Sequence, residues 1–121
     1  MKIITLLYIL NASLLILHEI ESAYEKEWEI LNLPGKISGF LFIHFPLLII
    51  LFYGVITINN LSNTGLILGV IFGFCGLLPV FVHKIIVPKK AKFNLTISNF
   101  IIYSNLLTGI LIFALSLYQL L

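Results

Sequence analysis

The chain has 121 residues, of which 60% are hydrophobic and 10% charged, and its formal net charge is +2. Soluble domains are roughly 45–50% apolar and about 25% charged, so this composition excludes an ordinary water-soluble domain. The small net charge and scattered basic residues also exclude a nucleic-acid-binding protein. We therefore expect one all-α domain, residues 1–121, whose solvent and main partner is the lipid bilayer.

Four apolar stretches follow one another along the chain. Each is long enough to cross the bilayer as a helix, which takes about 20 residues. The connections are a Leu-Pro-Gly breaker at 33–35, an uncharged turn at 59–65 and a basic turn at 88–92. The prediction is a four-transmembrane-helix bundle with spans at about residues 3–20, 39–58, 66–87 and 95–121.

The first span continues into a segment, residues 19–29, that contains all five acidic residues of the chain. We expect the helix to run on as an amphipathic acidic extension to about Leu31, with Tyr24 and Trp28 at the membrane interface. The alternative is a signal peptide cut after Ala23. The carboxylate of Glu21, three positions before that cut, argues against cleavage.

Lysines in short loops indicate the orientation of a membrane protein. Near one end of the bundle we expect six of the seven lysines: Lys26, Lys36, Lys84, Lys89, Lys90 and Lys92. The other end has Lys2 and the terminal amine. The prediction is a bacterial inner (plasma) membrane protein with both termini outside and both charged loops in the cytoplasm.

The three histidines and the acidic segment converge toward the cytoplasmic face in this topology. His18 lies at the end of the first span, His44 about five residues inside the second, and His83 near the end of the third. Ionisable residues within spans usually mark a functional site, because burying them in a bilayer is costly.

Imidazole and carboxylate groups together suit zinc, iron or manganese, and a His and a Glu at i, i+3 can reach one ion from the same helix. We predict a site for a divalent metal such as zinc, which would bind the ion or use it for hydrolysis. The predicted metal ligands are His18, Glu21, His44 and His83. The predicted catalytic base is Glu25, and the predicted supporting residues are Ser22, Asn94, Ser98 and Asn99.

Two other interpretations of these residues stay open. The cluster would serve proton transfer without a metal, as in a proton-coupled carrier, although four short helices enclose little pathway. Alternatively, water in the headgroup region solvates the glutamates, and the histidines form ordinary hydrogen bonds between helices.

A glycine ridge on the third span supports a different function. Gly65, Gly69, Gly73 and Gly76 form a small-xxx-small pattern that lets another helix approach closely. His83 follows Gly65 by about five helical turns and is expected to face protein with the ridge. The alternative function is a non-catalytic partner or structural protein that packs through the ridge, as a homo-oligomer or against another membrane protein.

The chain resembles an uncharacterised family of short bacterial integral membrane proteins, most strongly from His18 to Gly54. The resemblance rests on His-Glu-Ile-Glu at 18–21, Leu-Pro-Gly at 33–35, and His44 with Pro46. The opening is also similar to the HXXEE group of membrane proteins, which implies a metal-dependent hydrolase. His18 and Glu21 match that pattern, and Ser22 stands where the group has its second glutamate.

Overall fold

A computed structural model describes residues 1–86 and 93–121 of the chain. Within these residues the regular structure is helical and no strand occurs, which confirms the predicted all-α class. Val87 and the basic turn at 88–92 lie outside the described residues. The elements are α1 (Ile3–Tyr24), α2 (Glu27–Ile30), α3 (Lys36–Asn59), α4 (Asn63–Cys75), α5 (Leu78–Val80), the π-helical segment η1 (Phe81–Ile86) and α6 (Thr96–Leu120).

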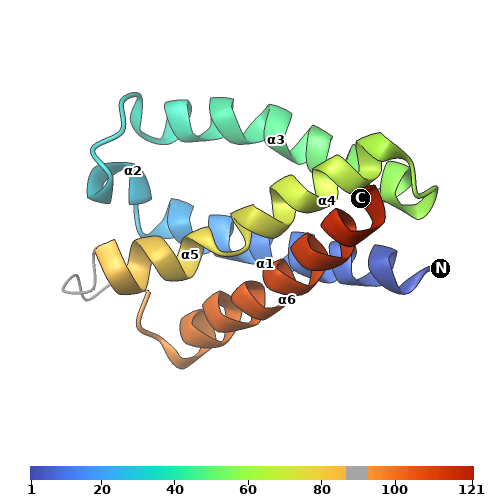
Figure 1. The fold of residues 1–121 in the computed structure, drawn as a ribbon. Helices are drawn as coiled ribbons and strands as arrows, with labels where there is room; N and C mark the ends of the chain where they lie inside the picture. Colours follow the sequence, from blue (N-terminus) through green and yellow to red (C-terminus); the bar gives the residue numbers. More distant parts are fainter. Residues whose placement is uncertain (87–92) are drawn as a thin grey trace.

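The predicted four-transmembrane-helix bundle is confirmed within the described residues. Four helical stretches of 22, 24, 24 and 25 residues are long and apolar enough to cross a membrane: α1, α3, the run Asn63–Ile86 made of α4, α5 and η1, and α6. At 1.5 Å per residue they extend about 33–38 Å, against a hydrocarbon core of about 30 Å. Both termini lie at the end of the bundle that carries the α3–α4 turn, and α2 lies at the opposite end (Figure 1).

The acidic extension of α1 is broken. α1 ends at Tyr24, and the chain turns at Lys26, whose φ of 53° is left-handed and cannot continue a right-handed helix. α2 then begins at Glu27 in a new direction. The structure thus differs from the expected continuous helix to Leu31, and α2 lies between the end of α1 and the start of α3 (Figure 1).

Glycines allow α4 and α6 to cross in close contact. A Cβ added to Gly73 would lie 2.7 Å from the backbone nitrogen of Phe113, and one added to Gly109 would lie 2.7 Å from the carbonyl oxygen of Gly73. The rest of the ridge packs inside the same chain. Gly65 meets the backbone of α3, Gly69 meets Ser116, and Gly76 meets Asn11 and the backbone of α6.

Two polar side chains in the middle of the bundle, Asn11 and Tyr8, form hydrogen bonds across helices. Asn11 of α1 is 1% exposed; its Nδ2 donates to the Phe72 carbonyl at 2.9 Å, and its Oδ1 accepts from Thr108 Oγ1 at 3.1 Å. Tyr8 Oη donates to the Leu51 carbonyl at 3.0 Å. Because the hydrocarbon offers no replacement partners, these bonds join α1 to α3, α4 and α6 at defined positions.

The third span changes helical form before it reaches the polar end. α4 ends at Cys75, and Pro79, which has no backbone N–H, cannot donate to the Cys75 carbonyl. The chain continues through α5 into the π-helix η1, and π-helical turns often occur at functional sites. His83 lies in η1 and is buried, which confirms that it faces protein.

Replacing Gly73 or Gly109 by alanine should destabilise the bundle. Alanine normally favours a helix over glycine by about 0.5–1 kcal/mol, but here the new Cβ meets backbone that cannot move aside. We expect the free energy of unfolding to fall by about 1–3 kcal/mol, measured by denaturation in detergent. Leu107→Ala, on the exposed face of α6, is the control and should have a smaller effect. Equal stability of all variants would contradict the packing described.

Candidate metal centre

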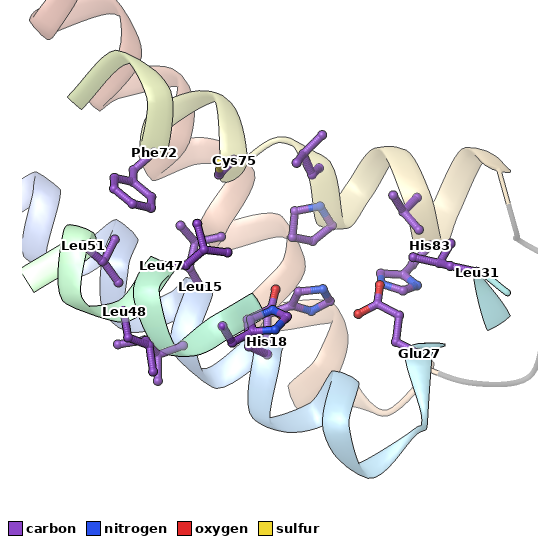
Figure 2. A pocket seen from close by; sticks show the side chains of 16 residues that line it. Leu15, His18, Glu27, Leu31, Leu47, Leu48, Leu51, Phe72, Cys75 and His83 are labelled. Carbon is purple, nitrogen blue, oxygen red and sulfur yellow. The ribbon is translucent and has the colours of Figure 1, made fainter. Parts of the chain in front are cut away.

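Two histidines and one glutamate from three elements meet at the α2 end of the bundle. His18 comes from α1, Glu27 from α2 and His83 from η1, and one potential ligand atom of each lies within 4.8 Å of the others. The two imidazole rings have centroids 5.0 Å apart. His83 Nε2 lies 3.1 Å from Glu27 Oε1. Figure 2 shows the Glu27 carboxylate beside the His83 ring. We call this set the His18–Glu27–His83 cluster.

The two imidazoles of the cluster are almost completely enclosed. His18 is 3% exposed and His83 is 6% exposed. The ring of Phe93, which precedes α6, stacks on His83 at a centroid distance of 3.9 Å. His18 Nε2 lies 3.5 Å from Ser22 Oγ, whereas its Nδ1 is buried and has no hydrogen-bond partner among the described residues. A buried nitrogen without a partner is costly, so it points to a ligand.

Glu27 is the anionic member of the cluster. Burial by itself would raise the pKa of its carboxyl group, but hydrogen bonds from His83 and Ser22, together with the electrostatic influence of the two imidazoles, outweigh burial. The pKa of Glu27 is therefore held below its usual value. At neutral pH the carboxylate is ionised, which is the form that coordinates a cation.

Glu27 reaches the histidines because α2 is anchored beside α3. The left-handed conformation of Lys26 reverses the chain after α1, and Trp28 is then buried against Phe40 of α3 with ring centroids 5.7 Å apart. With Trp28 facing α3, its neighbour Glu27 is turned toward η1. A tryptophan that the sequence marks as an interfacial anchor thus also positions a site residue.

His44 forms a separate pair with Glu19 at the edge of the same region. His44 Nε2 lies 2.8 Å from Glu19 Oε2, and the side chains are 25% and 34% exposed. His44 Nδ1 lies 2.7 Å from the Phe40 carbonyl, so Nδ1 carries a hydrogen and donates it there. One further proton must lie between Nε2 and the carboxylate. The Glu19–His44 pair therefore links α1 to α3 by a charge-assisted hydrogen bond.

The predicted site residues Glu21, Asn94, Ser98 and Asn99 form contacts outside the cluster. Ser98 Oγ donates to Glu21 Oε1, which joins α1 to α6. Lys84 Nζ donates to Asn99 Oδ1 at 2.6 Å and to Asn94 Oδ1 at 3.4 Å. These residues tie η1 and α1 to the start of α6.

The structure therefore brings together some of the predicted ligands and separates others. His18 and His83 meet, with Ser22 beside His18. His44 and Glu21 have the other partners just described, and Glu25, at the turn after α1, is not a member of the three-residue cluster.

A cavity of about 300 Å³ connects the cluster with the apolar interior. It lies between α1, α3 and the third span. His18, Glu27 and His83 line one end, and leucines from α1 and α3 with Phe72 line the other (Figure 2). Glu19 and His44 also line it. The cavity thus has a polar end and an apolar end.

Two functional candidates, Glu27 and Glu19, are absent from the predicted ligand set. Helical spacing favoured Glu21, which is one turn from His18, and that argument assumed an unbroken helix. Glu27 enters only because the chain turns at Lys26. The signals available in the sequence were the crowding of glutamates and the nearby tryptophan, and neither predicts a turn.

Fold and cluster together define a small four-helix membrane protein with a buried His–Glu group near one end of the bundle. The chain belongs to a family of unknown function, DUF6713, whose pattern matches residues 4–119. This confirms the expected membership in an uncharacterised family. No curated protein and no solved structure matches the chain.

Glu27→Gln should destabilise the protein in a pH-dependent way. The pKa of Glu27 is lower in the folded than in the unfolded protein, so its ionisation stabilises the fold at neutral pH. We expect a loss of roughly 1–3 kcal/mol in unfolding free energy, in line with a hydrogen bond to a charged group. The difference from wild type should vanish as the pH falls through the folded pKa, below the usual value of about 4.3.

Thermal unfolding across a pH series measures this effect. Glu29→Gln, which changes an exposed carboxylate on the same short helix, is the matched control and should behave like wild type. A Glu27→Gln variant as stable as wild type at neutral pH would show that the carboxylate does not stabilise the cluster.

Proposed function

We propose that this membrane protein binds a divalent metal ion such as zinc between His18, Glu27 and His83. The observation that carries the proposal is the convergence of three ligand atoms within 4.8 Å from three separate elements, two of them on almost fully buried imidazoles. The unpartnered Nδ1 of His18 supports it independently. Two histidines and a carboxylate are a usual ligand set of catalytic zinc sites.

Coordination of one ion would require the three ligand atoms to move closer together. Ligand atoms lie about 2 Å from zinc, so two ligands of one ion are at most about 4 Å apart. The observed limit of 4.8 Å requires the side chains to close by roughly 1 Å, which small rotations about side-chain bonds provide. Ser22, hydrogen-bonded to His18 and Glu27, would hold the ligands in place.

Hydrolysis is the chemistry that such a site would supply. Three protein ligands leave a fourth position on a tetrahedral ion for water, and a bound divalent ion makes that water acidic enough to act as a nucleophile near neutral pH. The base that would accept its proton stays a prediction. Glu25 is the residue that the sequence favours, and the Glu19–His44 pair, which lines the same cavity, is the second candidate.

The alternative, a protein that packs against a partner through its glycine ridge, has less support. The ridge glycines already contact α3, α6 and Asn11 of the same chain. A partner helix would have to displace these contacts.

Metal binding is tested by titrating zinc into metal-free, detergent-purified protein in a calorimeter. We expect one site per chain. His18→Ala, His83→Ala and Glu27→Gln should each weaken binding by at least about 10- to 100-fold, the range known even for residues that only support a ligand. His44→Ala is the matched control: it removes an imidazole from the same cavity but not from the cluster, and should bind like wild type. Absence of binding by wild type, or an equal loss in His44→Ala, would reject the assigned ligand set.

We also propose that the protein lies in the plasma membrane with both termini outside. Among the described residues, Lys26, Lys36 and Lys84 lie near the α2 end, and Lys2 lies at the other end, which supports this orientation. Reporter fusions test it. A periplasm-active phosphatase should be active when fused after Leu121 or Leu61 and inactive when fused after Gly35. The reverse pattern would contradict the proposal.

A further inference from the structure

The cavity beside the cluster is shaped like the site of an amphipathic molecule. Its apolar inner wall is made by Leu15 of α1, Leu51 of α3 and Phe72 of α4, which are buried at 9%, 3% and 8% exposure. The polar cluster closes one end (Figure 2). A ligand in this space would place an apolar part along the leucines and a polar part at the histidines.

The outer wall of the cavity lies on the lipid-facing side of the bundle. Leu47 and Leu48 of α3 and Leu78 of α5 are 44%, 37% and 40% exposed, and all three lie on segments apolar enough to span the membrane. The wall that these leucines form is therefore exposed to the bilayer, where a dissolved molecule can contact it without crossing water. This favours a lipid-soluble ligand over a water-soluble one.

Cavity size favours a ligand with one chain. The volume of about 300 Å³ is at the lower end of the roughly 300–1,000 Å³ known for small-molecule sites. It suits a single acyl chain better than a phospholipid with two.

The charge of the metal-loaded site selects the headgroup, and this step rests on the proposed metal function. A divalent ion with one carboxylate ligand, Glu27, has a net charge of about +1. The Glu19–His44 pair adds no net charge when a protonated imidazole faces the carboxylate. A ligand carboxylate would neutralise the site and supply an oxygen for the fourth coordination position.

We propose that the cavity binds a single-chain fatty acid, with its carboxylate on the metal held by His18, Glu27 and His83 and its chain along Leu15, Leu51 and Phe72. The fatty acid enters from the bilayer between α3 and α5. The fatty acid either occupies the position of a substrate or is the product of hydrolysis at this site. The second role follows because hydrolysis of a lipid ester releases this carboxylate.

The test uses the full chain in lipid nanodiscs, loaded with zinc, and radiolabelled palmitate as the probe. The labelled palmitate should bind with a stoichiometry of one per chain, and unlabelled palmitate should displace it. Methyl palmitate has the same chain but no carboxylate, and it should compete at least about tenfold more weakly, which corresponds to 1.4 kcal/mol. Equal competition by the two would overturn the carboxylate–metal contact.

Two neighbouring substitutions on α3 separate the cavity from the lipid surface. Leu48→Trp fills the cavity and should weaken palmitate binding by about tenfold or more, whereas Ile49→Trp, 55% exposed and outside the cavity lining, should leave it unchanged. Both variants should still bind zinc. Equal palmitate binding by both variants would overturn the assigned cavity.

His83→Ala separates this inference from the proposed function. If wild type binds zinc but palmitate binding survives His83→Ala unchanged, the fatty-acid site is wrong and the metal site stands. If wild type binds no zinc, the metal site fails, and the headgroup assignment fails with it.

Discussion

The contact between His18 and His83 is the interaction on which the rest of the polar end depends. It joins the first span to the third in a bundle whose outer surface faces hydrocarbon, where an imidazole without a polar partner is costly. Glu27 provides a carboxylate for this pair, and Phe93 stacks on His83. The cluster is therefore an enclosed polar site in an apolar protein, and the unpartnered Nδ1 of His18 is the feature that a bound cation would explain.

The close crossing of α4 and α6 holds that contact in place from a distance. Gly73 and Gly109 bring the two helices together, and Asn11 joins α1 to the last turn of α4 through the Phe72 carbonyl. Beyond this tightly packed region the third span changes from α- to π-helix, which alters the direction of the side chains that follow. Rigid packing in the middle of the bundle thus sets where η1 presents His83.

The loosest wall of the bundle is α3, and this explains where the cavity lies. In its membrane-spanning window α3 has 22% of its residues buried, against 39% in each of the other three spans. Near α2 it is held by the Glu19–His44 pair and by the contact of Trp28 with Phe40. The low burial of α3 goes with the cavity, whose lining includes Leu47, Leu48 and Leu51 of this helix.

The sequence by itself determined the class of the protein, because apolar runs of about 20 residues separated by breakers have one stable form in a bilayer. It also indicated that His18 and His83 would face inward at one end, since helical period and topology limit where they can lie. Only the tertiary structure decided the third member of the cluster. Glu21, one turn from His18, instead accepts a hydrogen bond from Ser98. Glu27 lies beside His83 because Lys26 turns the chain and Trp28 packs on α3. Packing between segments distant in the sequence stabilises that turn, and the helical periodicity of the sequence does not predict it.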